Sequence, residues 1–207
     1  MPLKLDLTQL NPQTLGAAPK EVAFKDKKLP ADAPPEPIAL KIEHAFQEGL
    51  LWCWAACIQM VRNYEQPNAP LQQCKIVRIK VGDDNHPCPA DQDQRLDDCE
   101  PIDMASAWRA CGIEKVVPVT GAISLKAVKE ELKAHRPVEV GISWTLGGGH
   151  AVLIKGWTAT EPESLIIDDP LRTNDLGLPA SGLARYDDLL VALGHGSWDY
   201  TWARLEP

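Results

Sequence analysis

The stretch QEGLLWCWAAC, residues 47–57, contains residue types that a thiol reaction requires. Cys53 stands between two tryptophans, and Gln47 precedes it by six positions. Apolar residues recur at helical spacing after Cys53, which predicts that a helix begins there. A helix N-terminus presents free N–H groups and a partial positive charge, and this field favours the thiolate, the reactive form of cysteine.

A reactive thiolate also needs a cationic partner that can carry a proton, and histidine suits both tasks near neutral pH. Among the five histidines, His150 follows Gly147–Gly149 and opens the β-rich run HAVLIKGWTA. The glycines leave room for another backbone, and a strand would hold the imidazole rigidly. By position alone, however, an ordinary histidine at a strand edge explains His150 better. The others are expected at element edges or in loops: His44, His86, His135 and His195.

A catalytic histidine usually has an acceptor that orients its second ring nitrogen. A hairpin from HAVLIKGW to SLIIDDP would bring Asp168 or Asp169 level with His150. Alternation along a strand puts these aspartates on opposite faces, so only one of them can be the partner. The alternative is that Asp-Asp-Pro simply ends the strand in a common turn. An oxyanion would need donors, which the Gln47 amide and the Cys53 backbone N–H can provide.

These segments resemble the papain-like cysteine peptidases. Gln47, five further residues and then Cys53-Trp54-Ala55 resemble the opening of that family's active site, and GHAVLIKGW resembles its histidine strand. IIDDP resembles the Asp-Pro version found in bacterial branches, which include bacteriocin-leader peptidases and papain-like effector peptidases of plant pathogens. The resemblance extends from about residue 45 to the C-terminus and includes the closing YDDLL and GSWDYTWARL.

The resemblance implies a role for each residue of the site. Cys53 would be the nucleophile, His150 the base and acid, Asp169 the orienting carboxylate and Gln47 the oxyanion donor. The choice of Asp169 over its neighbour rests on its place before the proline. One departure is Leu50, which stands where papain carries a further cysteine. This departure favours a compact bacterial enzyme over a lysosomal type.

Three further residues are expected to contact the substrate. Trp52 precedes the nucleophile and is predicted to line the cleft. Gly148 and Gly149 precede His150 and would let a substrate backbone approach. Cys57 lies one helical turn after Cys53 and is expected to be a buried packing thiol.

The elements predicted around these residues indicate an α+β fold. We expect a papain-like arrangement in which an N-terminal helical part, with the nucleophile helix, packs against a C-terminal antiparallel β-sheet. Helices are predicted at 53–65, 71–79, 102–111, 124–135 and 186–193, with Ser124 as an N-cap. Strands are predicted at 138–144, 150–159, 164–170 and 196–205.

The proline-rich start of the chain predicts two regions. Residues 1–40 are expected to form an extended N-terminal arm, and residues 41–207 the papain-like domain. The arm is interpreted as a leader, a propeptide or a strap across the domain, with a plain disordered tail as the alternative. The start also lacks the features of a secretory signal peptide. We therefore expect either the bacterial cytoplasm or export without a recognisable signal peptide.

Net charge, the length of apolar runs and cysteine spacing argue against nucleic acid, a membrane and a metal as partners. A net charge of −8 at pH 7 opposes binding to phosphate backbones, so no nucleic acid is expected. No apolar run approaches the roughly 20 residues that span a bilayer, so no membrane is expected. No two of the six cysteines have C-x-x-C spacing, and neither a metal nor an organic cofactor is expected. Four cysteines lie in the middle of the chain: Cys74, Cys88, Cys99 and Cys111. They could form two disulfides, in one of three pairings, or they could all be buried free thiols, and both interpretations stay open.

The leading hypothesis is a monomeric cysteine peptidase that hydrolyses peptide bonds in a peptide or protein substrate. One alternative uses the same residues for deamidation or acyl transfer in a bacterial toxin or effector. The other is a non-catalytic peptide-binding module, in which the cysteines would form disulfides or bind zinc.

Overall fold

The structure, a computed structural model, describes residues 37–88, 103–159, 162–171 and 181–207. Its helices are α1 (Cys53–Glu65), α2 (Gln73–Val81), α3 (Met104–Ala110), α4 (Leu125–Lys133) and α5 (Tyr186–Leu190), and a 3₁₀ turn, η4 (Ala192–Gly194), follows α5. Its strands are β1 (Ile38–Ala39), β2 (Lys115–Thr120), β3 (Val138–Trp144), β4 (Gly149–Thr158), β5 (Ser164–Asp168), β6 (Ser181–Ala184) and β7 (Gly196–Glu206).

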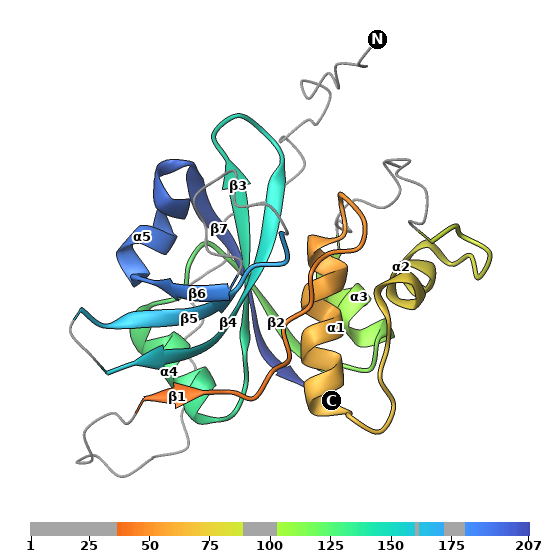
Figure 1. Ribbon diagram of the computed structural model, residues 1–207, viewed down its shortest axis with the longest axis horizontal. Coiled ribbons are helices and arrows are strands. Elements are labelled where there is room, and N and C mark those ends of the chain that lie inside the picture. The colour runs from red at the N-terminus through yellow and green to blue at the C-terminus, as the bar shows by residue number, and fades with distance from the viewer. Residues whose placement is uncertain (1–36, 89–102, 160–161, 172–180) are drawn as a thin grey trace.

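The strands form one antiparallel sheet in the order β2-β7-β3-β4-β5-β6, and β1 pairs with the second half of β4. Helices α1, α2 and α3 lie together at one side of this sheet (Figure 1). This arrangement confirms the predicted α+β fold with a helical part packed on an antiparallel sheet. Within the described ranges, no helix combines the length and apolar character needed to cross a membrane.

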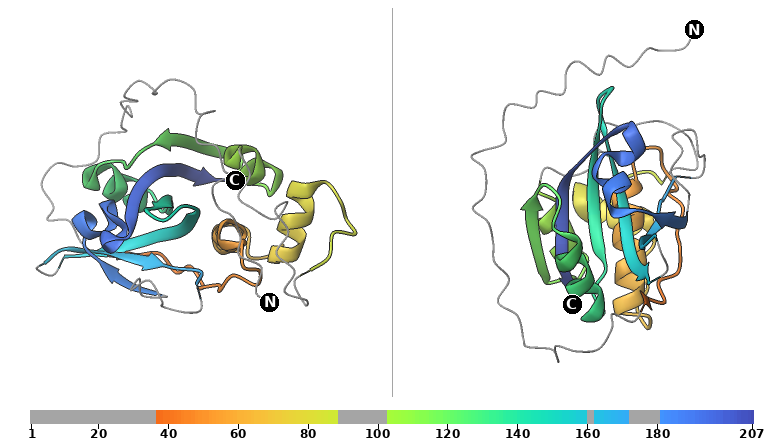
Figure 2. Two further views of the ribbon diagram at one scale, coloured as in Figure 1. Left: turned by 90° about the horizontal axis from the view of Figure 1, so that it is seen from above. Right: turned by 90° about the vertical axis from the view of Figure 1, so that its left-hand side faces the viewer.

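Helix α1 is the central helix of the core. It contacts β4 on one side and α2 on another, and Figure 2 shows it between the sheet and α2. Its apolar periodicity predicts one buried face, but the helix is buried almost all round, including Ala55 and Ala56 at 0% exposure. Small side chains at these positions allow close packing on both sides.

Most predicted elements are present, with ends that differ by a few residues. The predicted helix at 124–135 is α4, and the Ser124 side chain accepts a hydrogen bond from the Ala127 N–H as expected of an N-cap. The strands predicted at 138–144, 150–159, 164–170 and 196–205 are β3, β4, β5 and β7. Strands β3 and β4 are buried over most of their length, in keeping with their β-rich apolar sequences.

Three short strands were not predicted. Strand β2 contains Pro118, which argues against a central strand, but β2 lies at the edge of the sheet where a proline is tolerated. Strand β6 is the four-residue strand at the other edge. Strand β1 falls in the last residues of the predicted arm and pairs with Trp157 and Gly156. Residues 1–36 lie outside the described part, so the arm and its boundary stay predictions.

The middle cysteines follow neither expected pattern. Cys74 and Cys88 form a disulfide with a Cα–Cα distance of 5.4 Å. Cys111 is a buried free thiol, and Cys99 lies outside the described residues. Burial raises the pKa of the Cys111 thiol to about 11, although the nearby Arg62 opposes this shift. The expectation of four free thiols is therefore wrong for Cys74 and Cys88.

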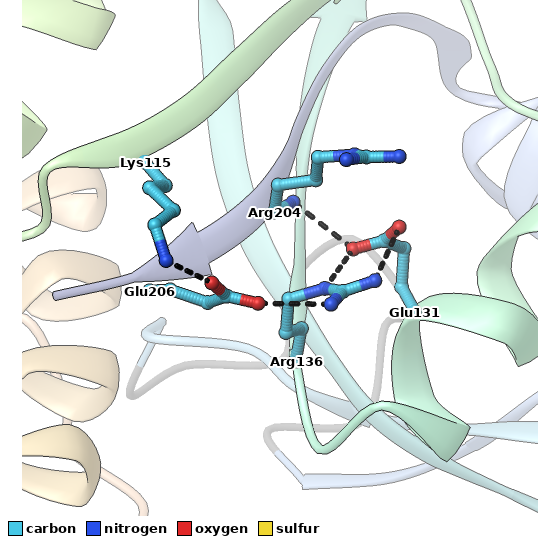
Figure 3. Close-up of polar contacts among 5 residues, drawn as sticks. All are labelled: Lys115, Glu131, Arg136, Arg204 and Glu206. Carbon is cyan, nitrogen blue, oxygen red and sulfur yellow. Dashed lines mark hydrogen bonds and ion pairs between the residues drawn. The ribbon is translucent and has the colours of Figure 1, made fainter. Parts of the chain in front are cut away.

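A polar network fastens the end of α4 to β7 (Figure 3). Arg136 donates from Nε and Nη2 to Glu131, at 2.6 and 3.1 Å, and from Nη1 to Glu206, at 2.8 Å. The Arg204 N–H also donates to Glu131, at 3.1 Å, and Lys115 pairs with Glu206 at 2.9 Å. The hydrogen bonds that Glu131 accepts from Arg136 raise the pKa of Arg136 above its ordinary value.

We expect Glu131→Ala to lower the free energy of unfolding by about 1–3 kcal/mol, because it removes the bidentate partner of the partly buried Arg136 guanidinium, which then keeps Glu206 alone. Lys115→Ala is the control. The Lys115 side chain is 69% exposed, so its loss should cost under about 0.5 kcal/mol. Urea unfolding measures the free energy of unfolding of both variants. Equal decreases would contradict the expectation that Glu131 contributes more to stability than Lys115.

Candidate active site

Cys53 is the first residue of α1 and is 8% exposed. The residue before it, Trp52, occupies the N-cap position and makes no capping hydrogen bond with its side chain. The first N–H groups of a helix have no partner within the helix. The sulfur therefore lies where the field of the helix N-terminus is strongest.

His150 is the second residue of β4 and is 3% exposed. Its Nε2 lies 2.6 Å from Oδ1 of Asp169, and its ring also forms a hydrogen bond with the Cys53 side chain. Trp144, at the end of β3, stacks on the imidazole with ring centroids 5.8 Å apart and an interplanar angle of 17°. The imidazole thus contacts a thiol, a carboxylate and an aromatic ring at once.

These contacts shift the protonation of His150 strongly. Burial by itself lowers the pKa of an imidazole, because it disfavours the cation. The hydrogen bonds and negative charge of Asp169 and Cys53 outweigh burial and raise the pKa of His150 to about 10. His150 is therefore held as the imidazolium at neutral pH, the cationic partner that a thiolate requires.

The two neighbouring aspartates have different environments. Asp169 Oδ1 faces His150 and also accepts a hydrogen bond from the Leu171 N–H at 2.9 Å. Asp168 projects to the other face of the sheet, where Oδ2 lies 2.7 Å from Lys155 Nζ and Oδ1 lies 3.4 Å from His44 Nδ1. The opposite orientations follow from strand alternation.

Gln47 lies close to Pro170, the residue after Asp169, and is 8% exposed. Its backbone N–H donates to the carbonyl of Pro170 at 2.8 Å, which ties its segment to the residue after Asp169. Its side-chain Nε2 donates to Gly49 O at 3.0 Å and to Leu50 O at 2.7 Å. Both amide hydrogens therefore hold the turn that leads to Cys53, and one of them would have to leave that turn to reach an oxyanion.

The three residues expected to contact the substrate differ in their exposure to solvent. Trp52 is 1% exposed and packs beneath Gly49, where an added Cβ would lie 2.8 Å from the indole. The Trp52 side chain is part of the core, and its contact with a substrate stays a prediction. Gly148 and Gly149 are exposed in the β3–β4 hairpin, which extends beyond the neighbouring strands (Figure 1). Gly148 has φ +85°, and a Cβ there would meet no atom within 4 Å.

Two features of the site had no signal in the sequence. Trp144 belongs to a predicted strand, but its stacking on His150 depends on the β3–β4 register, in which Ile142 lies opposite His150. The buried pairing of Asp168 with Lys155 depends equally on the β4–β5 register, in which Leu153 lies opposite Asp168. Within the described residues, no three or more His, Cys, Asp or Glu side chains are grouped to hold a metal ion.

Residues 37–186 match the family described as papain-like cysteine protease AvrRpt2. The chain belongs to this family. The match covers well over half of the sequence and includes Gln47, Cys53, His150 and Asp169. It confirms the predicted resemblance to papain-like cysteine peptidases of the effector type.

Solved structures agree with the fold. Xylellain, a cysteine protease from Xylella fastidiosa, is 15% identical with a TM-score of 0.52, over 92% of this chain and 96% of that chain. The proform of the ragweed pollen allergen Amb a 11, a cysteine protease, is 14% identical with a TM-score of 0.50, over 86% of this chain and 67% of that chain. At these identities the likeness establishes the papain-like fold alone. Among curated proteins, none matches the sequence.

Proposed function

We propose that the protein is a cysteine peptidase in which Cys53 is the nucleophile, His150 the base and acid, and Asp169 the group that orients His150. The observation that carries this proposal is the position of His150. Its buried ring contacts the Cys53 thiol and, through Nε2 at 2.6 Å, the Asp169 carboxylate. Membership of a cysteine protease family supports the same reaction and a protein substrate.

The reaction follows from these contacts. The Cys53 thiolate attacks the carbonyl carbon of the scissile bond, and the carbonyl oxygen takes up the negative charge. His150 gives its proton to the leaving amine as the C–N bond breaks, which leaves an acyl thioester. Water then attacks the thioester while His150 accepts its proton. The C–S bond breaks, the carboxylic acid leaves, and the thiolate–imidazolium pair is restored.

Asp169 keeps the imidazole in the productive orientation through these steps. Its Oδ1 is itself held by the Leu171 N–H, so the carboxylate cannot rotate away without loss of that bond. Trp144 covers the ring of His150. Partial exclusion of water strengthens the charge interactions within the group.

The alternative acyl transfers share this chemistry up to the thioester. A deamidase attacks a side-chain amide and releases ammonia, and an acyltransferase passes the thioester to an amine in place of water. Peptide hydrolysis is preferred because the family is described as proteases. The binding-module alternative loses support because the disulfide, Cys74–Cys88, leaves Cys53 as a free thiol beside His150.

The test is incubation of a mixed peptide library with the protein and with Cys53→Ala, followed by mass spectrometry. Hydrolysis yields two fragments whose masses sum to the peptide plus water. Deamidation exchanges one NH₂ for OH within an intact peptide, and acyl transfer adds a supplied amine such as methylamine with loss of ammonia. Cleavage that depends on Cys53 supports the proposal. Either of the other mass changes would replace it, and an unchanged library would contradict it.

We expect Gln47→Ala to lower kcat by about 10²-fold with a smaller change in KM, because the amide is the proposed second oxyanion donor beside the Cys53 N–H. Steady-state kinetics on the best library peptide measure this. An unchanged kcat would show that the amide serves only the Gly49 and Leu50 carbonyls that it contacts here.

A further inference from the structure

Gln73, the first residue of α2, is 1% exposed although glutamine is usually a surface residue. Both the oxygen and the nitrogen of its side-chain amide have hydrogen-bond partners. Oε1 accepts a hydrogen bond from the Glu48 N–H at 2.8 Å, and Nε2 donates at 2.8 Å to both Phe46 O and Gln59 Oε1. A buried amide is costly without partners, so these contacts fix the side chain in one orientation.

The two backbone groups that Gln73 binds belong to the residues on either side of Gln47. The amide therefore pairs with residues 46–48 as a neighbouring strand would, through one donor and one acceptor. Gln47 itself is held from another element, because its N–H donates to the Pro170 carbonyl at 2.8 Å. The segment is thus clamped between α2 and the residue that follows Asp169.

The clamped residues 46–48 are connected to the nucleophile through the turn that precedes Cys53. The Gln47 side chain binds Gly49 O and Leu50 O, and the Trp52 N–H donates to Gly49 O at 3.1 Å. The turn of residues 49–52 therefore depends on residues 46–48 for its position. Cys53 follows immediately, and its backbone N–H is one of the two proposed oxyanion donors.

Helix α2 offers a rigid support for the clamp. Cys74, next to Gln73, is bonded to Cys88. On the preceding side, the Asn63 amide accepts from the Leu71 N–H at 2.8 Å and donates to Leu71 O at 3.3 Å. Asn63 thus makes the same two-point contact as Gln73, with the segment that leads into α2.

We propose that Gln73 is a positioning residue for the oxyanion side of the active site: it holds the backbone of residues 46–48 and thereby places the Gln47 amide and the Cys53 N–H. The inference rests on the proposed function of Cys53. It assigns Gln73 no contact with the substrate. Its effect reaches the reaction through the two donors alone.

The test compares two reactions of Cys53. Hydrolysis of an N-acylglycine p-nitrophenyl ester passes through an oxyanion. Alkylation by iodoacetamide displaces iodide at a saturated carbon and forms no oxyanion. For Gln73→Met, which removes the hydrogen bonds at similar volume, we expect kcat to fall roughly tenfold or more while the alkylation rate stays within about twofold. Gln73→Leu also removes the hydrogen bonds without adding a charge, and it serves if the methionine variant does not fold.

Gln66→Met is the matched control, because it removes the hydrogen bond that another glutamine amide donates to a backbone carbonyl, Gly112 O at 3.0 Å, beyond the C-terminal end of α1. It should lower the thermal midpoint and leave both rates unchanged. An unchanged kcat in a folded Gln73 variant would overturn the proposal. So would a parallel fall in kcat and alkylation, or the same loss of kcat in Gln66→Met. Absence of turnover in the unsubstituted protein would instead refute the proposed function on which the inference rests.

Discussion

Cys53→Ala is expected to lower kcat/KM by on the order of 10⁴-fold or more while the protein remains folded, because the substitution removes the atom that forms the covalent bond. The site is 8% exposed at the edge of the core, so the loss of a sulfur there leaves little empty volume. Peptide cleavage and thermal unfolding, measured on the same preparation, test both parts of this expectation.

Cys57 is the matched control, one turn further along α1. Its side chain is 0% exposed, and Cys57→Ala should lower the free energy of unfolding by about 1 kcal/mol through a small cavity. Its kcat/KM should stay within about twofold of the unsubstituted protein. The assignment of Cys53 would be contradicted if Cys57→Ala were inactive or Cys53→Ala active.

Asp169→Asn is expected to move the alkaline limit of activity to lower pH and to lower kcat by on the order of 10²-fold. His150 must carry a proton for the leaving amine, so kcat/KM should fall as the pH rises through its pKa of about 10. Burial lowers that pKa, and the hydrogen bond and charge of Asp169 are among the interactions that raise it. Removal of the Asp169 charge therefore lowers the pKa of His150. A pH profile of kcat/KM from pH 7 to 11 measures the shift.

Asp168→Asn is the control, because Asp168 contacts Lys155 and His44 on the other face of the sheet. We expect a loss of about 1–3 kcal/mol in the free energy of unfolding, since Lys155 is only 16% exposed and loses its anionic partner. The alkaline limit should stay near that of the unsubstituted protein. A shift in Asp168→Asn but not in Asp169→Asn would reverse the two roles.

The raised pKa of His150 also predicts how stability depends on pH. A histidine with a folded pKa above its ordinary value of about 6.5 stabilises the fold most below that value. The contribution then declines as the pH rises and is lost by about pH 10. Thermal unfolding of His150→Ala should therefore differ most from the unsubstituted protein at low pH and least above pH 10.

The local parts of the site could be predicted because their signals are local. The apolar spacing after Cys53 marks a helix start and the β-rich run after His150 marks a strand, while the choice of Asp169 before Pro170 comes from the family resemblance. Each signal depends on a few neighbouring residues and on the geometry of one element. The order of these residues in the chain then supports the family resemblance, and the structure brings the three side chains together.

The rest depends on contacts between segments far apart in the chain. The burial of Trp52 is set by Gly49 and the surrounding core. The stacking of Trp144 requires the β3–β4 register, and the clamp on residues 46–48 requires α2 to dock beside α1. In the sequence Gln73 is an ordinary polar residue at a helix start. Side-chain burial and hydrogen-bond partners arise from packing of whole elements, and residue spacing carries no information on that packing beyond each element.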